Sequence, residues 1–167
     1  MSSSETSVLR RRLLAAAPLL ALAGCGFQLK GAATMQFESI ALTGFPPRSA
    51  VEQDLRAALK GNVTIKDSPD QAQVVLQALE EQRLRRAVAF SAAGEVRDVQ
   101  LRTIFRYRAQ TPAGRELIPD SRIELVRELT FIERQALGKQ QEAEALFREM
   151  QSDIVQQVVL RLSTLRP

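Results

Sequence analysis

The 167-residue chain is 45% hydrophobic and 25% charged, which allows one modest core and favours a single small domain. It has no His and a single Cys, so His-based acid–base chemistry, Cys–His nucleophilic pairs and the common zinc sites are excluded, and we expect neither a metal site nor a cofactor. Residues 1–24 hold three of the 23 basic and one of the 19 acidic side chains, so the remaining 20 basic and 18 acidic side chains give no reason to expect nucleic-acid binding.

The amino-terminal segment has the organisation of a bacterial export signal. A basic cluster at 10–12 precedes an apolar run over 13–23, which is too short to span a bilayer. The run leads into the sequence LAGC at 22–25, which resembles the lipobox of bacterial lipoprotein signal peptides. We therefore predict a signal peptide over residues 1–24 and a mature chain that begins at an acylated Cys25. The ordinary secretory route and the twin-arginine route both remain open.

A first strand and a helix are predicted after the mature start. Residues 35–42 are rich enough in apolar side chains for a strand, and a Pro-containing segment ends it. Ser49 then stands three residues before Glu52, which is the spacing of a capping box at a helix start. Apolar residues recur at helical spacing up to Leu59, and Gly61 is a suitable stop.

The middle of the chain predicts strands joined by short turns. Residues 74–79 and 84–90 indicate one long or bent strand, 96–109 indicates the returning strand, and 122–132 indicates a further one. Consecutive strands with short connections favour an antiparallel meander.

The last segment has the clearest periodicity in the chain. Apolar residues recur at three- and four-residue steps from about 139 to 165, with charged and amide side chains between them. One face of this long helix should cover the sheet. The order of elements over residues 25–167 predicts a single α+β domain, a two-layer sandwich with a mostly antiparallel four-stranded sheet and two helices packed on one face.

Three stretches of the chain together resemble one protein family. The mature start CGFQLKG at 25–31, the turn sequence FSAAGEV at 90–96 and the sequence ALGKQQEAE at 136–144 resemble, in this order, corresponding stretches of the LptE family of LPS-assembly lipoproteins. The first would follow the lipobox directly, the second would form a β-hairpin tip, and the third would begin the long helix.

The resemblance implies a non-enzymatic function at the outer membrane of Gram-negative bacteria. LptE is a plug inside the barrel of LptD, and the pair delivers lipopolysaccharide to the outer leaflet. The resemblance further implies that the protein supports LptD assembly and binds lipopolysaccharide. Gly26, where an inner-membrane retention signal would be Asp, favours an acyl-anchored position on the periplasmic side of the outer membrane.

A candidate ligand surface follows from the alternation within 99–109. Because strand side chains alternate between two faces, Arg102, Arg106 and Arg108 should share one face, with neighbouring arginines about 6 to 13 Å apart. This spacing suits the phosphates of lipid A, since guanidinium forms paired hydrogen bonds to phosphate oxygens. Lys139 matches a basic position that the family has at the start of the long helix. The competing interpretation is a solvated face paired with acidic neighbours such as Glu124 and Glu128.

Two other functions are weighed against this one. The first is a different small envelope lipoprotein that binds a protein or peptidoglycan partner through a free sheet edge. The second is a hydrolase built on paired carboxylates, with Glu80 and Glu81 or Glu142 and Glu144 as the pair. Adjacent or alternate acidic residues on exposed faces are mostly solvated charge, so we expect no catalysis.

Overall fold

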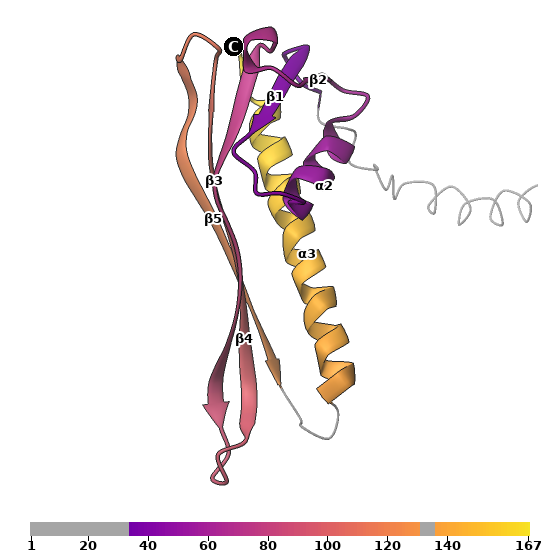
Figure 1. Cartoon of the computed structure of the whole chain (residues 1–167), viewed down its shortest axis with the longest axis vertical. Coiled ribbons are helices and arrows are strands. Elements are labelled where there is room, and N and C mark those ends of the chain that lie inside the picture. Colours follow the sequence, from indigo (N-terminus) through magenta and orange to yellow (C-terminus); the bar gives the residue numbers. More distant parts are fainter. Residues whose placement is uncertain (1–33, 131–135) are drawn as a thin grey trace, which may run out of the picture. The chain divides into compact units, whose positions relative to one another are not determined.

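The computed structural model describes residues 34–130 and 136–167 (Figure 1). The predicted signal peptide, the lipidation site Cys25 and the mature start therefore lie outside the described residues. The elements, in chain order, are β1 (Ser39–Thr43), α2 (Ala50–Leu59), β2 (Thr64–Lys66), a 3-10 turn (Pro69–Gln71), β3 (Val74–Phe90), β4 (Val96–Gln110), β5 (Glu116–Thr130) and α3 (Ala136–Ser163).

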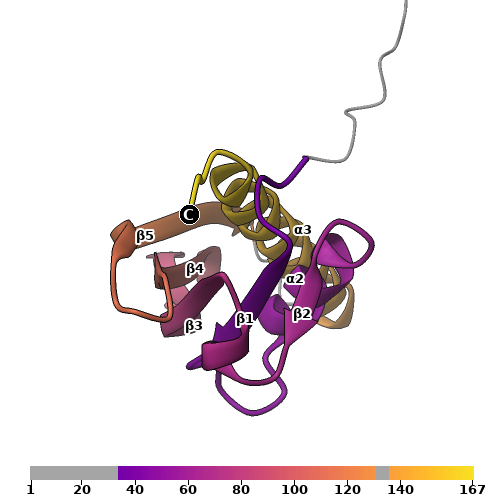
Figure 2. The same ribbon diagram turned by 90° about the horizontal axis from the view of Figure 1, so that it is seen from above.

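The five strands form one mixed sheet in the order β2-β1-β3-β4-β5. β1 pairs in parallel with both β2 and β3, whereas β3, β4 and β5 form the expected antiparallel meander. The sheet is mostly antiparallel, as predicted, but the predicted count of four strands is wrong, and the parallel pairing of β1 was not expected. The strand β2 was missed because its three residues are too few to show a period-2 pattern. The helix α2 connects β1 to β2 as a crossover, so the two strands run parallel. Figure 2 shows β2 and β5 at opposite ends of the curved sheet.

Three element boundaries differ from those expected. β1 begins at Ser39 rather than at 35, because Met35 and Phe37 pack against the core ahead of the strand instead of joining the ladder. β3 is one continuous strand that passes through 80–83 with a bulge between Ala78 and Glu80. β5 begins before the expected residue 122 and includes Pro119, which an edge strand tolerates because one side of it needs no ladder hydrogen bonds.

The start of α2 is capped as predicted, but only in part. Ser49 Oγ accepts a hydrogen bond from the backbone N–H of Glu52 at 2.9 Å. The Glu52 carboxylate does not complete the capping box, because it pairs with Arg56 at 2.8 Å instead. Ser49 Oγ also donates to Glu81 Oε2 at 2.6 Å and so ties the helix start to β3.

Both helices lie on the same face of the sheet, as predicted (Figures 1 and 2). The larger core cluster joins α2 and the second half of α3 to the inner side chains of the strands, and Phe105 stacks on Tyr107 at 5.4 Å between ring centroids within it. A second cluster lies under the first half of α3 and comprises Val99, Leu101, Leu129, Ala143, Phe147 and Met150. Each fully buried large side chain contributes about 1.5–3 kcal/mol.

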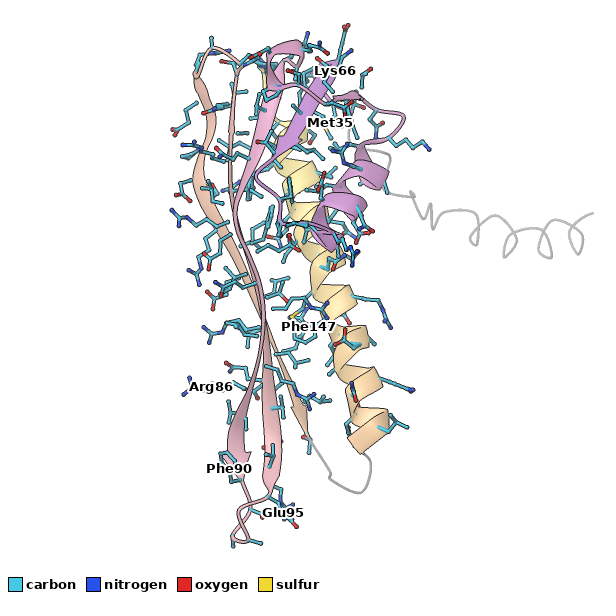
Figure 3. The ribbon with its side chains drawn as sticks, in the orientation of Figure 1. Met35, Lys66, Arg86, Phe90, Glu95 and Phe147 are labelled. Carbon is cyan, nitrogen blue, oxygen red and sulfur yellow. The ribbon has the colours of Figure 1, made fainter. Side chains whose placement is uncertain are left out.

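The β3–β4 hairpin extends beyond β1, which pairs only with Val74–Gln77 of β3. Arg83 of β3 holds this extension to α3, because its Nη2 pairs with Glu144 Oε2 at 2.7 Å and its guanidinium lies 4.2 Å from the ring centroid of Phe147. Figure 3 shows Phe147 reaching from α3 towards the strands, whereas Arg86 points away from the helix.

Gly44 marks the point where β1 leaves the sheet, and its substitution should destabilise the fold. Its φ is +74°, and a Cβ at this position would lie 2.3 Å from the carbonyl oxygen of Ala78. We predict that Gly44→Ala lowers the free energy of unfolding by about 3 kcal/mol, through left-handed strain and steric overlap. Gly114→Ala is the matched control, since φ is +86° there with nothing within 4 Å, and should cost about 1 kcal/mol. Urea unfolding followed by circular dichroism measures both, and equal losses would contradict the close-approach explanation.

Candidate functional site

The sheet face opposite the helices carries the predicted arginines. In β4, the side chains of Val99, Leu101, Thr103, Phe105, Tyr107 and Ala109 are buried on the helix side, as the alternation predicts. The opposite face, here called the outer face, is set by the strand register. Its members are Glu80, Gln82, Leu84 and Arg86 of β3, Gln100, Arg102, Ile104, Arg106 and Arg108 of β4, and Arg122, Glu124, Val126 and Glu128 of β5.

Arg102 forms an ion pair across the strands. Its Nη1 lies 2.9 Å from Glu124 Oε1, and its Nη2 donates to Gln100 Oε1 at 3.2 Å. The other oxygen of Glu124 accepts from Arg122 at 2.8 Å. The pairing with Glu124 that the competing interpretation names is therefore present, whereas Glu128 forms no ion pair within the described part of the chain.

Arg106 and Arg108 also have polar partners. Arg106 binds Asp120 through two hydrogen bonds, one of them from Nε to Oδ1 at 2.7 Å. This hydrogen bonding lowers the pKa of Asp120 below its ordinary value and raises the pKa of Arg106. Arg108 donates from Nε to Gln77 Oε1 at 2.9 Å. A phosphate at these guanidinium groups would have to replace a carboxylate or an amide of the protein itself.

The outer face also carries three apolar side chains among the charged ones. Ile104 lies between Arg102 and Arg106 along β4 and is only 4% exposed, although no helix covers it. The long stems of the two arginines can shield it from water. Leu84 and Val126, which flank Arg102 across the strands, are 45% and 37% exposed. The face therefore intersperses apolar side chains with cationic groups.

Lys139 lies apart from the three arginines. It is in the first turns of α3, which covers the inner face of the sheet, and its Nζ pairs with Glu142 Oε2 at 2.7 Å. The structure thus brings Arg102, Arg106 and Arg108 together on one face and leaves Lys139 on the helix side.

The carboxylate pairs considered for hydrolysis do not converge. Glu80 and Glu81 point to opposite faces of β3, and Glu81 accepts from Ser49. Glu142 pairs with Lys139, while Glu144 pairs with Arg83 of β3. Within residues 34–130 and 136–167, there is no group of three or more side chains suited to holding a metal ion. No helix of that same part combines the length and apolar character needed to cross a membrane.

Several partners of the arginines were not expected from the sequence. Asp120 precedes the strand predicted at 122–132, and only the early start of β5 places it beside Arg106. Gln77 reaches Arg108 because β3 and β4 pair over almost their whole length. Arg83 falls within the gap left between the two predicted stretches of β3, where the polar sequence EEQR at 80–83 gave no sign of a contact with the long helix.

Comparison with known proteins agrees with this architecture. The model of the LptE family, described as lipopolysaccharide-assembly, matches residues 37–162. No curated protein matches the chain. Among solved structures, an uncharacterized lipoprotein B from Nitrosomonas europaea has a TM-score of 0.71 and 28% identity, covering 83% of this chain and 90% of its own.

Two further structures share the fold at lower identity. The rare lipoprotein B from Shewanella oneidensis has a TM-score of 0.65 and 22% identity, covering 76% of this chain and 95% of its own. A minor lipoprotein from Acinetobacter baumannii has a TM-score of 0.62 and 18% identity, covering 80% of this chain and 99% of its own.

The pairing of Arg106 with Asp120 predicts a measurable titration. Because the pKa of Asp120 is lowered in the folded state, the pair stabilises the fold above the ordinary pKa of the carboxyl and loses this contribution as pH falls through the lowered value. In Arg106→Gln the pKa of Asp120 should rise towards its ordinary value, with Arg108 still lowering it in part. An NMR titration of the carboxyl measures this shift. Arg115→Gln is the control, and an unchanged midpoint in Arg106→Gln would refute the assignment.

Proposed function

The chain belongs to the LptE family of lipopolysaccharide-assembly proteins, and we propose that it is the lipoprotein that plugs the LptD barrel in the outer membrane. In this role it would assist LptD assembly and the transport of lipopolysaccharide to the outer leaflet. The observation that carries the proposal is the extent of the family match, which runs from Phe37 ahead of β1 to Leu162 near the end of α3. It therefore includes the whole sheet and both helices.

The described residues support a binding role rather than an enzymatic one. Glu81, Glu142 and Glu144 are each engaged by a different partner. The predicted arginines Arg102, Arg106 and Arg108 form ion pairs or hydrogen bonds with their neighbours. A sheet with one face free of helices offers a surface for contact. We therefore propose that the protein works without catalysis and without a cofactor.

The barrel association is best tested without the tether, since a plug is held by its surroundings. A soluble form that starts after Cys25 should co-purify with LptD in a one-to-one complex when the two are produced together. If only a monomer is recovered, the plug assignment fails. That result would favour the alternative of another envelope lipoprotein that binds a protein or peptidoglycan partner through a sheet edge.

Cys25 should be the point of processing and anchoring, because it is the only thiol in the chain. Each buried methylene of an acyl chain contributes about 0.8 kcal/mol, so several chains on one Cys anchor a protein stably. Mass spectrometry of the membrane fraction should find a diacylglyceryl group on the mature amino terminus. Cys25→Ser should leave an unlipidated precursor that retains residues 1–24, and a mature start at any other residue would contradict the prediction.

We further propose that Arg102, Arg106, Arg108 and Lys139 contribute to lipopolysaccharide binding. The three arginines share the outer face with the apolar side chains of Leu84, Ile104 and Val126. A phosphate could replace Glu124 or Asp120 as the partner of a guanidinium group there. Because Lys139 lies on the helix side, it would act at a separate position.

Charge reversal tests the arginines of β4 and Lys139 separately. The Arg106→Glu, Arg108→Glu variant should weaken lipopolysaccharide binding by about tenfold or more through lost guanidinium–phosphate hydrogen bonds, and more strongly at low salt. The control is the double variant Lys60→Glu, Arg148→Glu, which changes the net charge by the same amount at positions outside the outer face. It should bind lipopolysaccharide as the wild type does. Binding by the purified soluble domain, with circular dichroism as folding control, measures both. Unchanged binding in the first variant would show that the arginines of β4 do not bind lipopolysaccharide. Unchanged binding in Lys139→Glu would show the same for Lys139.

A further inference from the structure

A groove runs along the free edge of β5. It has a volume of about 530 Å³ and separates the middle of β5 from the last turns of α3. Arg122, Ile123, Glu124 and Leu125 line one side, and Leu160 and Arg161 line the other. Consecutive strand residues point to opposite faces, so a groove that touches all four of them must follow the strand edge rather than one face.

The edge of β5 is blocked at both ends of this groove. At the start, Pro119 has no backbone N–H, and its carbonyl oxygen accepts from Ser121 Oγ at 2.8 Å. At the other end, Arg127 Nη1 donates to the carbonyl oxygen of Val126 at 3.1 Å, and its Nη2 reaches Asp153 of α3 at 3.4 Å. Proline and charged side chains are the usual protection of edge strands. Between these blocks, β5 is the outermost strand of the described sheet and can accept another strand.

The groove has apolar and cationic parts. Leu160 is 59% exposed although it sits on a helix that is otherwise packed on the sheet, and Ile123 and Leu125 are half-buried opposite it. Arg122 is already paired with Glu124. Arg161, in contrast, has no carboxylate partner among the residues described. The one hydrogen-bond contact of its guanidinium with a described residue is from Nη1 to the hydroxyl of Tyr107 at 3.5 Å.

The exposed guanidinium of Arg161 makes the groove complementary to an acidic side chain. Tyr107 is fully buried, and its hydroxyl accepts only a long contact from Arg161. Because Arg161 is exposed and has no carboxylate partner among the described residues, a carboxylate in the groove could accept hydrogen bonds from its guanidinium.

We propose that this groove binds an extended segment of the LptD partner as a sixth strand. The segment pairs its backbone with the open stretch of β5 between Pro119 and Arg127. It places an apolar side chain against Leu160 and a carboxylate on Arg161. Strand addition derives affinity from backbone hydrogen bonds and specificity from pockets for alternate side chains. The inference rests on the proposed function, since it assumes that LptD is the partner of this chain.

The first experiment identifies the occupant by photocrosslinking. The full lipidated chain, with p-benzoylphenylalanine in place of Leu160, is produced together with LptD and irradiated. An adduct should form, and mass spectrometry should map it to an extended LptD segment that contains Asp or Glu. An intact complex with no adduct at this position, or an adduct to a segment without an acidic residue, would overturn the proposal.

The second experiment tests the charge on Arg161. Arg161→Glu should lower the recovery of LptD with the full chain by about tenfold, as for a buried interface charge left facing a like charge. Reversing the acidic residue of the crosslinked segment to Arg should restore recovery. Arg148→Glu, on the same helix outside the groove, is the matched control and should change nothing. If wild type and Arg161→Glu recover LptD equally, the groove is not the contact, whereas loss of the complex in the wild type itself refutes the plug function as well.

Discussion

The packing of α3 against one face of the sheet is the interaction on which the rest of the structure depends. The helix contributes to both core clusters, with Met150 in one and Ile154 in the other. It also supplies Glu144 and Phe147, which hold Arg83 and therefore the part of β3 that extends beyond β1. Because all large-scale apolar burial lies on this side, the outer face must be stabilised by other means.

Ion pairs between neighbouring strands lie on the outer face, and because each contributes little they leave that face adaptable. Pairs such as that between Arg102 and Glu124 are partly exposed, and an exposed pair typically contributes no more than about 1 kcal/mol. Exchanging a carboxylate for another anion at such a site therefore changes the stability of the fold little. The guanidinium groups of the outer face could therefore change partners with little effect on the fold.

The sequence predicted most of what depends on long periodic patterns. The helix near 139–165, the β3–β4 hairpin and the alternation in β4 are confirmed, because each repeats its pattern many times and buries one face. Features that depend on tertiary context were not predictable. The three-residue strand β2 has no periodicity to detect, and the passage of β5 through Pro119 follows from its place at the sheet edge. The partner of Arg106 was missed for the same reason, since Asp120 lay outside the predicted strand.

We propose one task for the outer face and the groove along β5, which is contact with a barrel partner and its lipid cargo. The central claim is tested most directly by extracting the native lipoprotein from outer membranes in mild detergent and determining the mass of its complex by native mass spectrometry. The account predicts one copy of this chain bound to one copy of LptD. Recovery of the chain alone, or with a different protein at fixed stoichiometry, would contradict it.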